Sequence, residues 1–358
     1  MPTQRAEYTN NQIPSPFPEG WYFVASRQDL MRARVIAKTW MGENIVVWRD
    51  DAGNACVAEA YCPHLGSYLG PETGGRVSEG KLVCPFHGYE FDISGQCVAA
   101  PFSDPPRNTW LKVFDSQEVG GLIFAWWGIG GRPPQWSLHP DRPSQEGWSA
   151  PEIRTVRFPG HPQETTENSV DLAHFLYVHG YGNVDRVGRL EIDGAYLQSR
   201  FDFRTVRKIL GFANFTMDVS AVTHVYGLGY SFVDIHERLI GMDMRMWVLA
   251  TPVDGIDIDL VLVSQVREIR NPKRRLAGLG FLPVGLRAPI FNKFVAASQH
   301  QDVLQDVTIW RHKRYRSRPR LCRADGEIMP FRAYCSQFYS DPSDVEKPGA
   351  LAPDRASP

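Results

Sequence analysis

The sequence lacks an excess of charge of either sign and lacks any long hydrophobic run. Its 39 lysine and arginine residues nearly cancel its 40 aspartate and glutamate residues, which leaves a formal net charge of -1. This balance excludes a basic nucleic-acid binder and an acidic disordered segment. A transmembrane helix needs about 20 consecutive apolar residues, and no apolar run in this sequence approaches that length. The polar residues 1–14 also lack the apolar stretch of a secretory signal, so we expect a cytoplasmic protein.

Cysteine is scarce, with six residues in a chain of 358. A reducing compartment argues against disulfides, so the thiols need another explanation. Four of them show no pairing pattern and are interpreted as ordinary free thiols: Cys56, Cys97, Cys322 and Cys335. The other two, Cys62 and Cys84, each lie in a short loop that also carries a histidine.

These two loops form the strongest local signal. They read Cys62-Pro63-His64-Leu65-Gly66 and Cys84-Pro85-Phe86-His87-Gly88. A Cys₂His₂ zinc site is one interpretation, but zinc fingers usually pair cysteine with cysteine and histidine with histidine. A Rieske [2Fe–2S] centre needs the mixed pattern, because two cysteines hold one iron and two histidines hold the other. The sequence therefore predicts that Cys62, His64, Cys84 and His87 bind a Rieske cluster.

A second group of metal-binding residues lies near the middle of the chain. Asn168, Asp171, His174 and His179 fall in a stretch from 162 to 180 whose apolar residues have helical spacing. Asp171 and His174 share a helix face, and the helix end at Gly180 can bring His179 to the same point. Two histidines and one carboxylate form the facial triad of non-haem Fe(II) oxygenases.

The carboxylate of this triad is expected from a later helix. A helical pattern from Leu286 to about Tyr315 contains Asp302 and Asp306, one turn apart, and only one of them is expected to face the iron. Between the two helical stretches, β-rich runs predict an antiparallel sheet. Its inward-facing aromatic and methionine residues are expected to form hydrophobic core in most cases, and the set is compatible with a pocket for a bulky apolar ligand: Phe201, Phe203, Phe212, Phe215, Met217, Tyr226, Tyr230, Phe232, Met242, Met244 and Trp247.

Composition shifts divide the chain into five parts. We predict an N-terminal arm at 1–18, a Rieske domain at 19–132, a linker at 133–152, a catalytic domain with a mononuclear iron at 153–340 and a disordered tail at 341–358. The segment from Leu276 to Val295 is expected at the mouth of the pocket.

Together, the two Cys/His loops and the Asn168-x-x-Asp171-x-x-His174-x₄-His179 motif resemble the α-subunit of Rieske non-haem iron oxygenases. The similarity runs from about Trp21 to Tyr339, and it is strongest to the group of the 3-ketosteroid 9α-hydroxylase oxygenase and cholesterol 7-desaturase. This resemblance implies an α+β protein with an all-β Rieske domain and a helix-grip (START/Bet v 1-like) catalytic domain, whose curved antiparallel sheet encloses the pocket.

The resemblance also implies roles for single residues and for partners. It favours Asp306 over Asp302 as the third iron ligand, and it makes Asp171 and Asn168 the candidate catalytic residues. In a homotrimer, His87 of one chain would meet Asp171 of its neighbour, and Asp171 would bridge electrons to His174. A flavin and iron–sulfur reductase, or a ferredoxin, would supply electrons from NAD(P)H, and O₂ would be activated at Fe(II).

The sequence thus predicts a Rieske monooxygenase that hydroxylates a steroid- or terpenoid-like substrate. Alternatives are an oxygenase for an aromatic or natural-product substrate, with hydroxylation, desaturation or demethylation, and a Rieske electron carrier without oxygenase activity. A sterol-binding module with a degenerate iron site is a further alternative.

Overall fold

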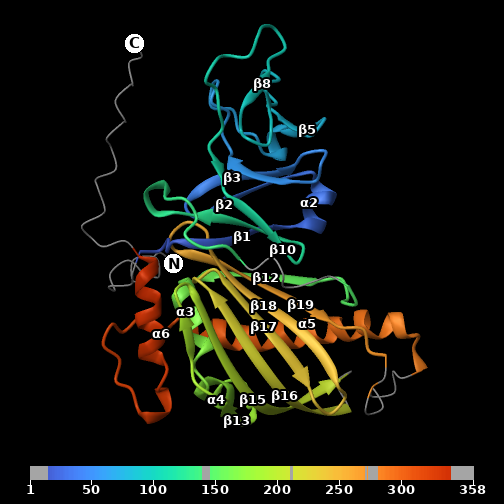
Figure 1. Cartoon of the computed structure of the whole chain (residues 1–358), viewed down its shortest axis with the longest axis vertical. Coiled ribbons are helices and arrows are strands. Elements are labelled where there is room, and N and C mark those ends of the chain that lie inside the picture. The colour runs from blue at the N-terminus through green and yellow to red at the C-terminus, as the bar shows by residue number, and fades with distance from the viewer. Residues whose placement is uncertain (1–14, 139–145, 210–212, 271, 273–280, 340–358) are drawn as a thin grey trace.

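A computed structural model of the chain describes residues 15–138, 146–209, 213–270, 272 and 281–339. Three small sheets occupy one end of an elongated molecule and one large sheet the other (Figure 1). Most of the expected arm at 1–18 and all of the expected tail at 341–358 lie outside the described residues. None of the helices in the described part combines the length and hydropathy of a membrane span.

The three N-terminal sheets are antiparallel and built from short strands. The first contains β1 (Gly20–Ser26), β11 (Leu122–Trp127) and β10 (Ser116–Val119). The second contains β2 (Val35–Trp40), β3 (Glu43–Arg49), β4 (Ala55–Glu59) and β9 (Val113–Phe114). The third contains β5 (Arg76–Ser78), β6 (Lys81–Val83), β7 (Glu90–Phe91) and β8 (Cys97–Ala99), and it forms the outer end of the molecule in Figure 1. Helix α2 (Arg27–Ala33) begins where the Ser26 hydroxyl accepts a hydrogen bond from the Asp29 amide.

The large sheet is antiparallel, with the strand order β12-β19-β18-β17-β16-β15-β13, and β14 pairs with β15. Its strands are β12 (Glu152–Pro159), β13 (Gly182–Arg186), β14 (Glu191–Asp193), β15 (Tyr196–Ile209), β16 (Ala213–Tyr226), β17 (Tyr230–Glu237), β18 (Met242–Pro252) and β19 (Asp257–Val266). Gly194 adopts a positive φ of 54° and turns the chain between β14 and β15.

Helix α5 (Val284–Trp310) crosses one face of this sheet (Figure 1). Its Asn292 side chain is fully buried, accepts a hydrogen bond from the Ser264 hydroxyl at 2.8 Å and donates to the carbonyls of Ala150 and Ser264. These bonds satisfy a polar group that burial would otherwise penalise, and they fix the helix on the sheet. The α+β architecture with a curved antiparallel sheet around a long helix is confirmed.

The opposite face of the large sheet packs against the N-terminal part. Trp21, Phe124 and Trp126 share a hydrophobic cluster with Trp247 and Val263 of β18 and β19. The amides of Met41 and Gly42 donate to the carbonyls of Pro252 and Val253, so main-chain hydrogen bonds join the two parts as well. Leu138 belongs to the same cluster, although the sequence places it in a linker.

The continuous helical stretch expected from 162 to 180 is wrong. The structure has α3 (Pro162–Thr166), a 3-10 turn η3 (Glu167–Ser169) and α4 (Ala173–Tyr177). Val170 leaves the helical region with φ -123° and ψ -15°, and the Asp171 carboxylate then accepts a hydrogen bond from the Ala173 amide at 3.0 Å. That local bond starts a new helix, as a capping side chain does. His179 therefore lies beyond the helix that carries His174. Helix α6 (Ile328–Cys335) follows α5 and completes the fold.

Candidate metal centres and substrate cavity

The two Cys/His loops have the same main-chain design. In the first, the Gly66 amide donates to the Cys62 carbonyl and the Cys62 amide donates to the Ser67 carbonyl, both at 2.8 Å. In the second, Gly88 donates to Cys84 at 3.0 Å and Cys84 donates to Tyr89 at 2.8 Å. Gly66 and Gly88 have φ values of 72° and 69°, in the left-handed region that glycine adopts freely. Each loop thus turns its cysteine and histidine to the same side.

These loops bring the four expected ligands together. Cys62 and Cys84 are each 2% exposed, and the rings of His64 and His87 have centroids 4.9 Å apart. Tyr89 stacks on His64 at 4.4 Å with a 12° angle between the rings. The Nδ1 atom of His87 is buried and has no hydrogen-bond partner among the described residues.

This donor set fits a Rieske cluster. A buried imidazole nitrogen without a partner is costly, and an iron ion would use it as a ligand. Burial raises the pKa of Cys62 to about 12, and the neighbouring Cys84 also raises it. Iron favours the thiolate and would reverse this effect, since a coordinating thiol loses its proton. We therefore place the cluster on Cys62, His64, Cys84 and His87 as a proposal.

In the C-terminal part, His174, His179 and Asp306 converge. One ligand atom from each lies within 4.8 Å of the others. His179 Nε2 is 3.4 Å from Asp306 Oδ2, and the two side chains are 4% and 9% exposed. The rings of His174 and His179 are 5.2 Å apart and nearly perpendicular. His174 comes from α4, His179 from the turn after it and Asp306 from α5.

Both imidazoles already use Nδ1, which leaves Nε2 for a metal. His174 Nδ1 lies 2.5 Å from the Asp171 carbonyl, and His179 Nδ1 lies 3.0 Å from Gln305 Oε1. Such outer hydrogen bonds fix the tautomer and the orientation of metal-binding histidines. Two histidines and one carboxylate in this arrangement fit a mononuclear Fe(II) centre. Gln305 was missed at the sequence level, although it directly precedes Asp306 in the chain.

The two imidazoles differ in electrostatic environment. Burial lowers the pKa of His174, against the attraction of Asp306 and Asp171, and this favours the neutral form that binds metals. Burial also acts to lower the pKa of His179, but its hydrogen bonds with Asp306 and Gln305 raise the pKa overall. The raised pKa means that His179 holds a proton more readily beside Asp306. A metal ion bound by these two residues would take the place of that proton.

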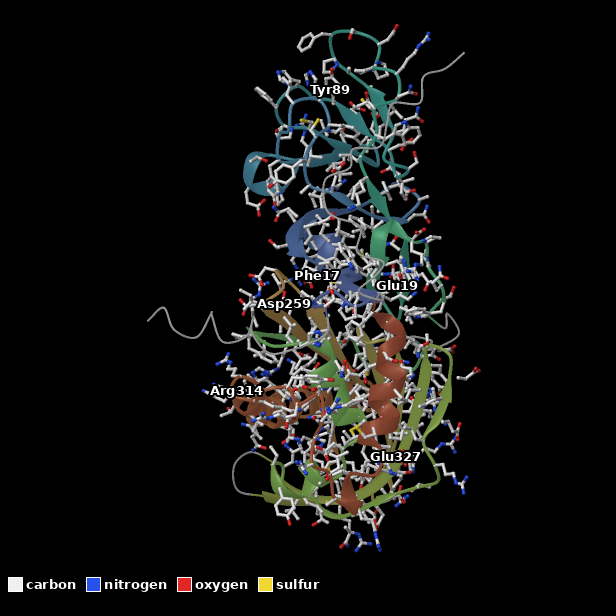
Figure 2. All side chains as sticks on the ribbon, turned by 90° about the vertical axis from the view of Figure 1, so that its left-hand side faces the viewer. Phe17, Glu19, Tyr89, Asp259, Arg314 and Glu327 are labelled. Carbon is white, nitrogen blue, oxygen red and sulfur yellow. The ribbon has the colours of Figure 1, made fainter. Side chains whose placement is uncertain are left out.

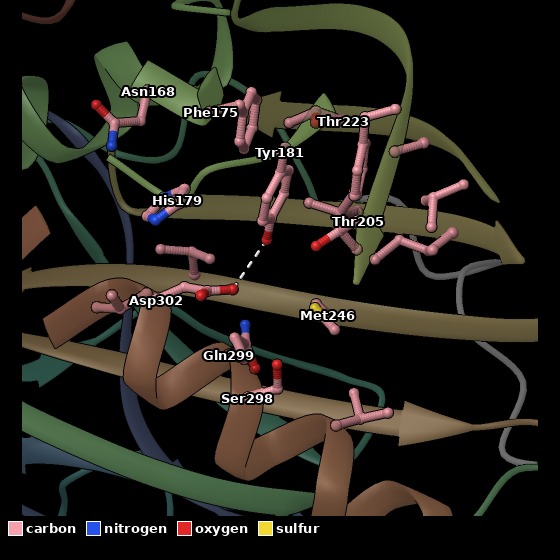
Figure 3. Close-up of a pocket in the computed structure, with 18 of the residues that line it drawn as sticks. Asn168, Phe175, His179, Tyr181, Thr205, Thr223, Met246, Ser298, Gln299 and Asp302 are labelled. Carbon is pink, nitrogen blue, oxygen red and sulfur yellow. Dashed lines mark hydrogen bonds between the residues drawn. The ribbon is translucent and has the colours of Figure 1, made fainter. Parts of the chain in front are cut away.

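The other three candidate residues have distinct positions. Asp171 contacts His174 through its main-chain carbonyl, while its carboxylate accepts from the Ala173 and His174 amides. Asn168 lies in η3 and lines the cavity next to the triad (Figure 3). Asp302 accepts a hydrogen bond from the Tyr181 hydroxyl at 2.8 Å across the cavity, and it is absent from the three-residue cluster.

A cavity of about 620 Å³ lies between the large sheet and α5, with the triad in its wall. Five of the expected lining residues are there: Phe201, Phe203, Met217, Met242 and Met244. Four others do not line it, because they alternate to the opposite face of their strands: Tyr226, Tyr230, Phe232 and Trp247. Trp247, Tyr230 and Phe232 belong to the cluster against the N-terminal part.

Phe212 and the side chain of Phe215 lie outside the described residues. Of the expected mouth segment, Phe294 and Val295 line the cavity and 276–280 lie outside the described residues.

Within one chain the two centres are far apart. Figure 2 places Tyr89, which stacks on His64, near one end of the molecule, and Glu327, at the start of α6, near the other. Helix α4 lies at the end opposite the Cys/His loops in Figure 1.

Comparisons with known proteins cover nearly the whole chain. Residues 20–115 match the Rieske [2Fe-2S] domain, and residues 125–339 match the 3-Ketosteroid 9alpha-hydroxylase C-terminal domain. The cholesterol 7-desaturase of Bombyx mori is 26% identical over 359 residues, which cover 95% of this chain and 73% of that protein. The oxygenase component of the 3-ketosteroid-9-alpha-monooxygenase of Rhodococcus rhodochrous is 25% identical over 368 residues, which cover 96% of this chain and 90% of that protein.

Solved structures share the fold. Dicamba monooxygenase bound to dicamba superposes with a TM-score of 0.66 at 17% identity, covering 89% of this chain and 96% of the other. NdmA of Pseudomonas putida CBB5 with caffeine gives a TM-score of 0.63 at 16% identity, covering 88% of this chain and 89% of the other. The C-terminal family match alone spans more than half of the chain. The chain therefore belongs to the 3-ketosteroid 9alpha-hydroxylase family of Rieske oxygenases, and it is an oxygenase component that uses a [2Fe–2S] cluster, a mononuclear iron and O₂.

Proposed function

We propose that this enzyme hydroxylates an unactivated carbon of a bulky apolar substrate with a steroid- or terpenoid-like skeleton. The cavity of about 620 Å³ with the triad in its wall carries this proposal. The sheet side of this cavity is lined largely by aromatic, methionine and aliphatic side chains, which favour a large apolar body. The relatives named above support the same substrate class, since their names refer to cholesterol and to 3-ketosteroids.

In this proposal His174, His179 and Asp306 hold the mononuclear iron, and Cys62, His64, Cys84 and His87 hold the cluster. When bound, the cluster supplies single electrons and the mononuclear iron supplies O₂ activation. The protein holds the imidazoles in the ligating tautomer through the Asp171 carbonyl and Gln305. The apolar wall excludes water and orients the substrate, while Asn168 provides a polar side chain next to the triad.

An oxygenase component of this family receives its electrons from a reductase. We propose that the donor here carries flavin and an iron–sulfur centre, or is a ferredoxin, and takes electrons from NAD(P)H. The proposal includes cytoplasmic location, because none of the six cysteines forms a disulfide, as a reducing compartment favours. It also keeps the division into an arm at 1–18, a Rieske domain at 19–132, a linker at 133–152, a catalytic domain at 153–340 and a tail at 341–358.

We propose a homotrimer in which the Cys/His loops of one chain dock beside α4 of the next. Both surfaces expose apolar side chains: Leu65, Phe86 and Phe102 near the loops, and Leu176 and Tyr177 on α4. Exposed apolar patches of this kind mark interaction sites. In that assembly His87 would approach Asp171 of the neighbouring chain. Electrons would then cross a short distance between chains, whereas the two centres within one chain are far apart.

A complementation experiment tests this assembly. Cys84→Ser chains and His174→Ala chains are each expected to lack turnover. Co-expressed, they are expected to regain part of it, because mixed trimers contain an intact loop pair facing an intact triad. Light scattering of the wild type should give the mass of three chains. A monomer, or mixed chains without activity, would contradict the trimer and leave the substrate proposal untouched.

Turnover of a substrate panel tests the function itself. Wild-type enzyme with a reductase, NADH and O₂ should convert a steroid or terpenoid to a product with one added hydroxyl, identified by mass spectrometry and NMR. A panel that yields only aromatic diols would overturn the steroid assignment. Desaturated or demethylated products would move the reaction to the alternative class.

A further inference from the structure

Two buried hydroxyls in the cavity wall have no hydrogen-bond partner among the described residues. Thr223 on β16 and Ser231 on β17 line the cavity and are 3% and 5% exposed. Neither hydroxyl makes a hydrogen bond to a described residue. The nearby lining residues Thr165 and Thr166 differ, since their hydroxyls donate to the carbonyls of Pro162 and Leu228 at 3.0 and 3.2 Å. The contrast matters because buried polar groups are normally paired.

The strand register places the two hydroxyls side by side on the cavity face. Thr223 pairs with Val233 and Ser231 pairs with Val225, so Thr223 and Ser231 are diagonal neighbours on adjacent strands. Residues in this relation have Cα atoms about 7 Å apart, so both side chains can reach a common small group. They lie near the β16–β17 turn, where the Thr166 hydroxyl donates to the Leu228 carbonyl.

The same register sets their separation from the triad. Thr223 pairs with Ser199 of β15, and the next cavity-facing residues of β15 are Phe201 and Phe203. These two rings contact Phe175, which follows His174 in α4, with centroids 5.1 and 6.1 Å apart. Two to four strand residues correspond to about 7 to 13 Å. The triad is therefore several carbon–carbon bonds away from the hydroxyl pair.

We infer that Thr223 and Ser231 form a polar anchor for one ketone or hydroxyl oxygen of an otherwise apolar, polycyclic substrate. A threonine or serine hydroxyl both donates and accepts, so the pair suits either oxygen. With that oxygen fixed near the β16–β17 turn, a carbon several bonds away faces the triad. The pair thereby determines which carbon is oxidised. This inference rests on the proposed function, and it names the chemistry that the substrate must carry at one end.

A binding experiment on the holoenzyme tests the anchor. The ligands are a steroid with a single ketone at one end of its ring system and the parent hydrocarbon, both delivered from cyclodextrin and followed by quenching of tryptophan fluorescence. The wild type should bind the ketone about 5- to 10-fold more tightly, as expected for a neutral hydrogen bond. In the Thr223→Val, Ser231→Ala double variant this ratio should fall to about 1, while the Kd of the hydrocarbon stays unchanged.

Ser220→Ala is the matched control. Ser220 also lies on β16, but it is three residues from Thr223, so it points to the opposite face of the strand and does not line the cavity. This variant should keep the wild-type ratio. The double variant should in addition spread hydroxylation over more carbons of the ketosteroid, whereas the control should give the wild-type product.

The outcomes separate the two proposals. If the wild type binds the hydrocarbon but does not prefer the ketone, the anchor is wrong and the proposed function stands. If the double variant keeps the preference and the single product, the anchor is also wrong. If neither compound binds, the steroid assignment fails and the anchor with it.

Discussion

His179 Nδ1 lies 3.0 Å from the amide oxygen of Gln305, the residue directly before Asp306 in α5. An amide oxygen only accepts hydrogen bonds, so Nδ1 carries the proton and Nε2 is left for the metal. Helix α5 thus carries both the proposed ligand Asp306 and the group that orients the proposed ligand His179. A shift of α5 would therefore displace two of the three proposed ligands together.

We expect Gln305→Ala to weaken binding of the mononuclear iron by about 10-fold or more, as loss of such orienting partners typically does. Competition with a chelator measures this affinity, and the visible absorption of the cluster should stay at the wild-type level. Leu304→Ala is the control, because Leu304 is 41% exposed on the neighbouring position of α5. Equal iron affinity in wild type and Gln305→Ala would show that Gln305 does not orient His179.

His174→Ala should separate the two centres by metal content. The wild type is expected to bind about three irons per chain, two in the cluster and one in the triad. The variant should bind about two and keep the absorption and electron paramagnetic resonance signals of the cluster. Leu176→Ala, in the same helix and 45% exposed, should keep all three. Loss of the cluster signals in His174→Ala would mean that the variant has a wider folding defect.

The two aspartates of α5 should respond differently to the same substitution. Asp306→Asn should lose the mononuclear iron, because Asp306 lies 3.4 Å from His179 Nε2 and belongs to the ligand cluster. Asp302→Asn should keep it, since that carboxylate bonds to the Tyr181 hydroxyl instead. Iron analysis of both purified variants decides which of the two aspartates binds the mononuclear iron. Iron loss in Asp302→Asn alone would reverse the assignment.

The local signals in the sequence predicted which cysteines and histidines lie close together. Cys62, His64, Cys84 and His87 lie in loops whose glycines and short spacing already predict convergence, and the structure brings these four residues together. The choice between Asp302 and Asp306 needed the family resemblance, since both lie on one helix. Gln305 carries no such signal, because an exposed glutamine on a helix has no distinctive spacing.

Long-range geometry accounts for most of what the sequence did not predict. The apolar residues from 162 to 180 have helical spacing, but the chain there does not form one helix. The Asp171 carboxylate starts a new helix, and His179 lies beyond its end. Tyr230 and Trp247 look like pocket residues by type. Strand alternation faces them to the N-terminal part, and only the register reveals that.

Breaking the buried ion pair between Glu167 and Arg332 should destabilise the protein strongly. Their closest atoms are 2.7 Å apart and the side chains are 8% and 9% exposed. We expect Glu167→Gln to lower the free energy of unfolding by about 3 kcal/mol, because Arg332 is left as an uncompensated buried charge. Urea unfolding followed by tryptophan fluorescence measures this free energy.

Glu43→Gln is the control, because it breaks an exposed pair with Lys112. It should change the free energy of unfolding by less than about 1 kcal/mol. Similar losses in the two variants would contradict this difference.

Lys313 should contribute stability that disappears only in strong alkali. Burial acts to lower the pKa of Lys313, but Glu164 and Glu167, at 2.9 and 3.3 Å, raise it above the usual 10.5. A raised pKa in the folded state means that the contribution is complete below the unfolded value and is lost as pH rises through the folded value. The difference in unfolding free energy between wild type and Lys313→Met should therefore be constant from neutral pH to about pH 10 and narrow above that. Lys112→Met controls for the loss of an exposed ammonium group. A difference that already narrows near neutral pH would show that burial dominates over the two carboxylates.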